Sequence, residues 1–508
     1  MQGKYFIGVD LGTSGTKAAL YQIDGKLIAD ASVEVPLFYP KPGVVEQENE
    51  DFYTSAAQTV RECLESSGVD PKDVAAIAFD SQMAGIGLVD EDFNPLARFD
   101  SWLDMRCRPY IEWMDKEAGN RVTQLTGCPP TCDHGPKMLW WKNEEPEIYR
   151  QTAKFVMPGT YVAGQLAGLK AEQAFIDHTY IHFSGFSDAQ KGTWSNELCE
   201  RFGLEIGKLP KIVDPCDVIG EVIESAGKEF GLVPGTLIAA GAGDTAANAL
   251  GAGIVRPGML FDVAGTASVL AGCTDDYVAD DKNRALLTMR SVIPELWHPL
   301  AYIGGGGLAL RWFRDQFFNT THGKVLPDSD DLYSQMIALA ATVAPGSEGL
   351  FFSPHLGGRI CPSNPEMRGA WIGASWSHSQ AHFARAILES IAYEYAYYLK
   401  ILKELLPEFE LLEARAVGGG ARSDTWNQIK ADVLNVPYQR LNGNEFGTWG
   451  AAMIAGKAAG LIDDLVTHAE QMAIGSGEAC LPSAENHKMY VPLVERYIEM
   501  EQMLEQFF

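Results

Sequence analysis

The stretch YFIGVDLGTSGTK at residues 5–17 predicts a buried strand that runs into a tight, hydroxyl-rich turn. The apolar run ends on Asp10, whose carboxylate we expect where a buried strand reaches solvent and can face a cation. Gly12 and Gly15 permit positive φ angles, and backbone N–H groups in such a turn can converge on an anion. Residues 18–21 then resume a strand. The stretch is therefore either a phosphate-binding hairpin with a metal-facing aspartate or an ordinary glycine-rich hairpin.

Composition bounds the class of protein. The 508 residues are too many for one core and suggest two to four domains. A net charge of −27 argues against nucleic acid or an anionic membrane as the main partner. Nine scattered cysteines are typical of free thiols, and the sequence shows neither a signal segment nor an apolar run near 18 residues. We therefore expect a soluble, cytoplasmic protein without a membrane partner.

A second hairpin of the same kind follows about 250 residues after the first. An apolar strand beginning at residue 259 runs into DVAGTAS at residues 262–268, which matches DLGTS at residues 10–14. Two such hairpins suggest an internal duplication. The repeat favours phosphate binding for both turns over the ordinary hairpin.

Two further segments carry candidate chemistry. Residues 418–423 (GGGARS) precede a predicted helix over 424–433, where glycines and the helix dipole favour a nucleotide over a plain turn. Asp244 begins a predicted helix within GDTAAN at residues 243–248. Its carboxylate can serve as a helix N-cap, as a catalytic group, or as both.

Taken in order, these four pieces resemble the sugar kinase, Hsp70 and actin superfamily, and more narrowly the FGGY carbohydrate kinases. Three local segments are similar to that family: GVVEQ at 43–47, SWLDMR at 101–106, and GGGARS at 418–423 with the residues that follow it. The resemblance implies an α/β fold in which two duplicated ribonuclease-H-like (actin-like ATPase) domains flank an ATP cleft. The expected N-terminal domain covers residues 1–253, with the sugar-binding side, the first phosphate turn and an insertion at about 110–230. The expected C-terminal domain covers residues 254–508, with the second phosphate turn, the adenosine-binding segment and a helical cap.

The resemblance also implies roles for individual residues in ATP-dependent, Mg²⁺-assisted phosphoryl transfer. Asp10 would face the metal, and Asp244 would contact the sugar and act as its general base. Gln82, Met83 and Asp104 would contact the sugar, although an ion pair between Asp104 and Arg106 is an equal alternative. ATP and its phosphates would be bound by Gly12, Thr13, Ser14, Thr16, Lys17, Gly265, Thr266, Gly307, Gly419, Gly420, Ala421 and Ser423.

The acceptor is less well defined by these patterns. Xylulokinases usually have His after Gln-Met, but this chain has Ala84, and the Arg-Glu pair of glycerol kinases is absent from the same loop. We expect a small sugar, with a ketopentose such as xylulose favoured over glycerol, erythritol, ribulose or gluconate. An actin- or Hsp70-like nucleotide switch and an inactive sugar sensor are the competing hypotheses. A homodimer is the assembly considered.

Overall fold

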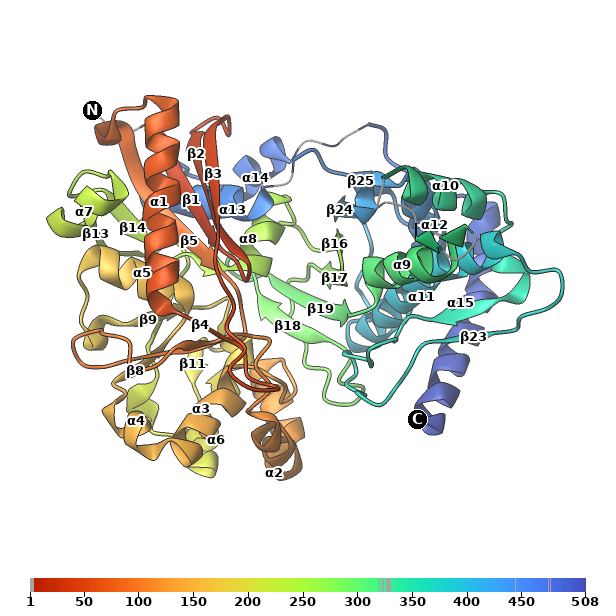
Figure 1. Cartoon of the computed structure of the whole chain (residues 1–508), viewed down its shortest axis with the longest axis horizontal. Coiled ribbons are helices and arrows are strands. Elements are labelled where there is room, and N and C mark those ends of the chain that lie inside the picture. Colours follow the sequence, from red (N-terminus) through yellow and green to blue (C-terminus); the bar gives the residue numbers. More distant parts are fainter. Residues whose placement is uncertain are drawn as a thin grey trace.

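The computed structural model describes residues 4–318, 320–321, 324–325, 330–443, 445–473, 475 and 477–508. Two α/β halves lie side by side, each built around its own sheet (Figure 1). Smaller strands pair outside these two sheets: β4 (Glu46–Gln47) with β7 (Phe99–Asp100), β6 (Gly87–Val89) with β8 (Lys154–Val156), β9 (Phe175–Asp177) with β12 (Lys211–Val213), β10 (Ser187–Asp188) with β11 (Thr193–Trp194), β20 (Thr320–Thr321) with β21 (Lys324–Val325), and β22 (Phe351–Ser353) with β23 (Ala370–Ile372).

The first sheet contains the opening hairpin. Its strand order is β13-β14-β5-β1-β2-β3, with β15 paired to β5. β1 pairs antiparallel with β2 and parallel with β5, so the hairpin leads into parallel strands. The strands are β1 (Tyr5–Leu11), β2 (Gly15–Gln22), β3 (Leu27–Glu34), β5 (Val74–Ser81), β13 (Val218–Glu221), β14 (Leu237–Ala239) and β15 (Ala242–Gly243).

Side chains of β1 alternate between two layers, as the period of two in a strand requires. Ile7 and Val9 pack in a core with Phe52 of α1 (Asn49–Ser67) and with α5 (Pro158–Ala167). Phe6 and Asp10 lie on the opposite face, toward α8 (Asp244–Gly251) and α13 (Phe446–Ala458). The same alternation that buries the strand therefore turns the Asp10 carboxylate away from α1.

Of residues 110–230, the segments with α2 (Arg108–Thr126), α3 (His134–Glu144), α4 (Pro146–Gln151) and α6 (Asn196–Phe202) form the lower part of the first half in Figure 1, whereas α7 (Glu224–Phe230) lies higher, beside the first sheet. Most aromatic side chains of this range are buried, including Trp141, Tyr180 and Phe186, which confirms that packing is their main role. Within this range, α5 and β13 pack on or pair into the first sheet itself.

The second sheet repeats the plan of the first. Its order is β18-β19-β17-β16-β24-β25, with β16 antiparallel to β17 and parallel to β24. In both sheets an antiparallel meander lies on one side of the hairpin's first strand and parallel strands lie on the other. This confirms the duplication. The strands are β16 (Met259–Ala264), β17 (Ser268–Gly272), β18 (Leu287–Arg290), β19 (Trp297–Ile303), β24 (Glu413–Val417) and β25 (Tyr438–Arg440).

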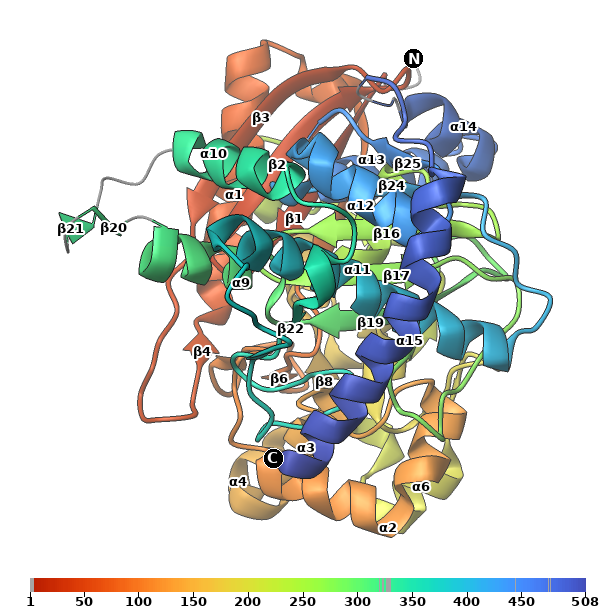
Figure 2. The same cartoon turned by 90° about the vertical axis from the view of Figure 1, so that its right-hand side faces the viewer.

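Helices cover the second sheet, and Figure 2 shows the last of them running across this half of the molecule. The long helix α11 is buried along most of its length. The helices are α9 (Gly306–Phe313), α10 (Asp330–Ala341), α11 (Gln380–Leu405), α12 (Asp424–Leu434) and α15 (Ala484–Phe507).

The glycine- and alanine-rich helix α13 returns to the first sheet, together with α14 (Leu465–Met472). A Cβ atom on Gly8 of β1 would lie 1.8 Å from the Thr448 carbonyl oxygen, and one on Gly450 would lie 2.0 Å from the Ala247 carbonyl oxygen. Glycine is required at both positions because backbone meets backbone there. After β25 the chain therefore returns from the second half to the first, before α15 packs on the second half again (Figure 1).

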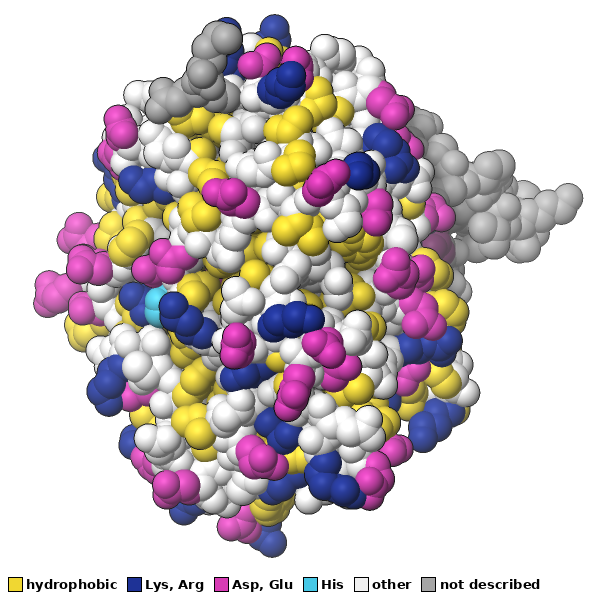
Figure 3. All heavy atoms as spheres, turned by 90° about the vertical axis from the view of Figure 1, so that its left-hand side faces the viewer, with side chains coloured by type: hydrophobic (Ala, Val, Ile, Leu, Met, Phe, Trp, Pro, Cys, Tyr) yellow, Lys and Arg dark blue, Asp and Glu magenta, His cyan; other side chains and the backbone are white. Residues whose placement is uncertain are grey.

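On the face of the molecule in Figure 3, acidic and basic side chains are interspersed and form no large patch of one charge. Within the described part of the chain, no helix has the length and apolarity needed to cross a membrane. The described cysteines are free thiols. The cytoplasmic location and the homodimer stay predictions.

Candidate active site

Three aspartates meet where neighbouring strands of the first sheet end. Asp10 of β1 pairs in parallel register with Asp80 of β5, and Asp80 in turn pairs with Ala242 of β15. Asp244 follows β15 directly as the first residue of α8. The sequence patterns predicted roles for Asp10 and Asp244 but not for Asp80. Its signal was nevertheless present, because the apolar run at 74–79 also ends on an aspartate, as the opening strand does.

Of the three carboxylates, that of Asp80 is fully buried, and those of Asp10 and Asp244 are half-buried. Burial raises the pKa of Asp10 and, reinforced by Asp10 and Asp244, raises that of Asp80 well above its usual value. Burial and then the charge of Asp10 raise the pKa of Asp244 to about 7. Neither oxygen of Asp80 has a hydrogen-bond partner among the described residues. The negative charge of these carboxylates is not balanced by basic groups around them. Such a set of oxygen donors fits a divalent cation.

Asp244 is the first residue of α8, and the N-cap position considered for it belongs to Gly243. The backbone N–H and the hydroxyl of Thr245 donate to its Oδ1, at 2.6 and 3.1 Å. No described residue donates to its Oδ2. The side chain is thus oriented at the start of a helix while one oxygen stays available to a ligand.

The first turn lies beside this cluster. The Gly12 N–H donates to the Gly15 carbonyl at 3.0 Å, and the Trp102 indole N–H donates to the Thr13 hydroxyl at 2.8 Å. Lys17 is half-exposed and forms an ion pair with Glu445 at 3.3 Å. Thr16 is fully buried, and its hydroxyl is 2.7 Å from that of Ser55 on α1. The backbone of Gly12, Thr13 and Ser14 therefore forms a turn at the cleft, whereas the Thr16 side chain points into the core.

The second turn borders a cavity of about 840 Å³ in the other half. The Gly307 N–H donates to the Gly265 carbonyl at 3.1 Å and fixes the turn against α9. The residues from the sequence prediction that line the cavity are Gly265, Thr266, Gly307, Gly419, Gly420 and Ser423. Ala421, which was also predicted, is buried outside the lining. Arg311 and Tyr333, which no sequence pattern indicated, line the cavity as well.

The glycine-rich segment stands at the N-terminus of α12, as predicted from sequence. The Ser423 hydroxyl accepts a hydrogen bond from the Trp426 N–H at 3.2 Å and caps the helix. A Cβ atom on Gly419 would meet no atom within 4 Å, so the backbone there faces open space. This arrangement allows a ligand to approach the chain closely.

Asp262 of the second hairpin has a different place from Asp10. It is fully buried, contacts Lys430 at 2.5 Å, and accepts hydrogen bonds from the hydroxyls of Tyr395 and Tyr438. Asp10 lies two residues before Gly12, whereas Asp262 lies three residues before Gly265. A shift of one residue turns a side chain to the other face of a strand. The two similar segments, at residues 10–14 and 262–268, therefore form the same kind of hairpin, but the second hairpin has no carboxylate that faces the metal.

The predicted sugar-side residues lie next to the first turn. The Gln82 amide donates to Gln47 at 2.8 Å and to the Gly12 carbonyl at 3.5 Å, and Met83 packs against Gly243. Asp104 is fully buried and forms a bidentate pair with Arg106, at 2.9 Å to each oxygen.

The ion pair considered for Asp104 is thus present. Arg106 also reaches Glu46 at 2.6 Å, and both belong to segments that resembled the family. This network holds the loops that carry residues 43–47 and 101–106 together. It leaves Gln82 and Met83 as the stronger candidates for sugar contact.

Comparison with known proteins identifies the family of this chain and several similar proteins. The model of the FGGY family of carbohydrate kinases, N-terminal domain, matches residues 5–251, and that of the C-terminal domain matches residues 261–459. Xylulose kinase of Bacillus subtilis is 29% identical over 97% of this chain and 96% of its own length. Gluconokinase of the same organism is 27% identical over 99% and 96%. A ligand-bound xylulose kinase structure from Lactobacillus acidophilus superposes with a TM-score of 0.90 at 25% identity, covering 99% of this chain and 98% of that one.

Proposed function

The chain belongs to the FGGY family of carbohydrate kinases, and we propose that it transfers the γ-phosphoryl group of ATP to a hydroxyl of a ketopentose such as xylulose. A carbohydrate kinase is a phosphotransferase with an alcohol group as acceptor, and this class displaces the nucleotide-switch and inactive-sensor hypotheses. The observation that carries the proposal is the position of Asp244. It is a half-buried carboxylate with one available oxygen, directly after a strand end that lies near Asp10.

In the proposed reaction, Oδ2 of Asp244 accepts the proton of the attacking sugar hydroxyl. The hydroxyl oxygen bonds to the γ-phosphorus while the bond from that phosphorus to the β,γ-bridging oxygen breaks, and ADP leaves. Burial and the nearby Asp10 raise the pKa of Asp244 to about 7, which makes it a better proton acceptor than an exposed aspartate. The hydrogen bonds from Thr245 keep the acceptor oxygen oriented.

ATP would lie between the two halves. We assign its phosphates to the turns at Gly12–Ser14 and Gly265–Thr266, with Lys17 and Gly307 beside them, and its adenosine to Gly419, Gly420 and Ser423. The 840 Å³ cavity beside the second turn supports this assignment. We leave Thr16 and Ala421 out of the site, because the first bonds Ser55 in the core and the second is buried outside the cavity.

Mg²⁺ fits the aspartate cluster. Asp10 and Asp80 would hold the ion, since both offer carboxylate oxygens and those of Asp80 are buried without a hydrogen-bond donor among the described residues. When bound, Mg²⁺ neutralises charge on the β- and γ-phosphates. The role of the chain itself is to keep these carboxylates at adjacent strand ends, on the side of the sheet where Asp244 also lies.

The ketopentose is supported by the relatives named xylulose kinase, but one residue keeps a sugar acid as the second candidate. Ala84 offers no side-chain donor where xylulokinases usually have His. Its φ of +63° and the bond from the Lys137 ammonium to its carbonyl, at 2.9 Å, fix the loop in an unusual conformation. Gluconokinase of Bacillus subtilis is nearly as similar as the xylulose kinase.

A coupled assay of ADP release with a panel of ketopentoses, polyols and aldonates tests the proposal. We expect sugar-dependent ADP release that is strongest with a ketopentose. Asp244→Asn should retain ATP binding and lower turnover by about two orders of magnitude or more. Asp464→Asn removes an exposed N-cap aspartate of α14 and serves as the matched control with normal turnover. Near-normal turnover in Asp244→Asn rejects the base, and release with aldonates alone rejects the ketopentose.

A further inference from the structure

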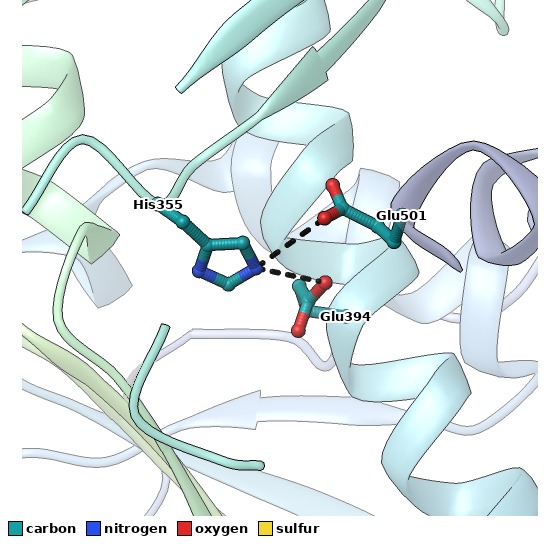
Figure 4. A group of neighbouring side chains, drawn as sticks. All are labelled: His355, Glu394 and Glu501. Atoms are coloured by element: carbon teal, nitrogen blue, oxygen red, sulfur yellow. Dashed lines mark ion pairs between the residues drawn. The ribbon is translucent and has the colours of Figure 1, made fainter. Parts of the chain in front are cut away.

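A second cluster of buried polar groups lies apart from the proposed kinase site. His355 belongs to the segment between β22 and β23, Glu394 to α11, and Glu501 to α15. All three residues are at most 2% exposed. One potential ligand atom from each lies within 4.8 Å of the other two. Figure 4 shows the Nε2 edge of the His355 ring facing both carboxylates.

The two distances from His355 to the carboxylates are long for hydrogen bonds. His355 Nε2 lies 3.4 Å from an oxygen of Glu394 and 3.6 Å from an oxygen of Glu501, beyond the usual limit of about 3.2 Å. Nε2 has no hydrogen-bond partner, nor does Oε1 of Glu501, within the described chain. An imidazole nitrogen that is buried without a partner normally carries a cost. Here it points at two carboxylates instead of water.

The same distances match the edges of a coordination tetrahedron. Zinc binds nitrogen and oxygen at about 2.0–2.2 Å, which places tetrahedral ligands about 3.4 Å apart. An octahedral ion with oxygen ligands at about 2.1 Å would bring them to about 3.0 Å. The observed 3.4 and 3.6 Å separations agree with the tetrahedral arrangement. An imidazole ligand also favours a transition metal over Mg²⁺ or Ca²⁺.

The carboxylates are held in position by neighbouring hydroxyl groups. Tyr497 donates to one oxygen of Glu394 at 3.0 Å, and Tyr398 donates to the other at 2.8 Å. Ser353 donates to Glu501 at 3.3 Å. Partners of this kind orient the ligands of metal sites and are part of their affinity.

The balance of charge also favours a divalent ion. Arg359 contacts Glu394 at 3.4 Å and Glu505 at 2.5 Å, so one guanidinium faces three carboxylates when Glu501 is counted. The carboxylates of the cluster therefore outnumber its guanidinium, and a divalent ion would offset the excess of negative charge. A cavity of about 10 Å³, lined by Arg359, Glu394 and Glu501, has room for one water-sized ligand.

We propose that His355, Glu394 and Glu501 bind one Zn²⁺ ion, with water as the fourth ligand, in a structural site that ties α15 to α11. The ligands come from three segments distant in the sequence, so the ion would cross-link the C-terminal helix to the core of the second half. Because none of the three lies in the proposed kinase site, the inference is independent of the proposed acceptor.

Metal content of the wild-type protein provides the first test. Protein purified without a metal column is stripped with a chelator, reloaded with Zn²⁺ and dialysed, and its metal is measured by mass spectrometry. We expect about one equivalent of retained zinc. Reloading with Co²⁺ should give the visible bands of a tetrahedral nitrogen and oxygen site. Failure to retain either metal, or near-ultraviolet thiolate bands from cysteine ligation, rejects the site.

His355→Gln provides the second test, with His298→Gln as its control. His298 is also buried in this half, and its Nδ1 bonds the Gly272 carbonyl, outside the cluster. We expect the retained zinc and the zinc-induced rise in Tm to be lost in His355→Gln and kept in His298→Gln. Equal retention in both variants overturns the assignment. If His355→Gln fails to fold, the Co²⁺ spectrum of the wild-type protein decides alone.

Discussion

At the scale of single residues, Asp80 illustrates how function is built at the expense of stability. It is a fully buried carboxylate between two others, and neither of its oxygens has a partner in the described structure. A Cβ atom on Gly447 would lie 3.4 Å from each of these oxygens, so the N-terminal turn of α13 approaches them closely. The positive end of the helix dipole offsets part of the charge. The remainder is available to a bound cation.

Asp80→Asn should separate these two effects. The amide keeps the volume and removes the charge, so we expect Tm to stay level or rise. We also expect kcat/KM to fall by about 100-fold, the lower end of what a lost electrostatic interaction in the transition state costs, with a higher Mg²⁺ requirement. Titration of activity and of thermal stability with Mg²⁺ checks both. An unchanged Mg²⁺ requirement would exclude Asp80 from the metal site.

At the scale of elements, the alanine- and glycine-rich helix α13 packs tightly on its neighbours because its side chains are small. The sequence could not indicate which neighbour, because Gly8 and Thr448 are about 440 residues apart and no local pattern records such a contact. The hairpins, the long α11 and the helix start at Ser423 were predictable because each depends on a few adjacent residues. The inward turn of Asp262 was not, because it depends on a register shift of one residue.

Gly450→Ala tests this packing. The added methyl group would lie 2.0 Å from the Ala247 carbonyl oxygen, and backbone on both sides leaves little room to adjust. We expect the free energy of unfolding to fall by about 3 kcal/mol, the upper end of typical overpacking costs.

Gly207→Ala is the control for this substitution. A Cβ atom there meets no atom within 4 Å, and the residue does not have a positive φ. This variant should be neutral or more stable by about 0.4–1 kcal/mol, because alanine restricts the unfolded chain. Denaturant unfolding of both variants gives the comparison, and similar stabilities would argue against a close approach at Gly450.

At the scale of the whole molecule, the proposed division at residues 253 and 254 does not produce two independent pieces. The face of β1 that carries Phe6 is covered by α13, which lies beyond residue 445 in the sequence. Fold class and duplication followed from the sequence because the hairpins repeat. The packing of α13 on the first sheet did not follow from the sequence, because it joins residues that are far apart in the chain.

Fragments of the chain test that conclusion. We expect residues 1–253 alone to aggregate or bind an apolar dye, since the face under α13 is exposed. The same fragment joined by a flexible linker to residues 445–473, which carry α13 and α14, should be monomeric and melt cooperatively. Size-exclusion chromatography and thermal melting compare the two. A monomeric, cooperatively melting 1–253 fragment would show that α13 is dispensable for the first half.

The packing of α13 on the first sheet also delays the folding of the first half during synthesis. About 200 residues separate Gly253 from Ala458, and a ribosome adds about 5–20 residues per second. The first sheet would thus wait on the order of 10–40 s, nascent and half-covered, before the helix that completes it emerges. During that interval its apolar face is a binding site for cellular chaperones, so the yield of active kinase depends on their supply as well as on the stability of the finished protein.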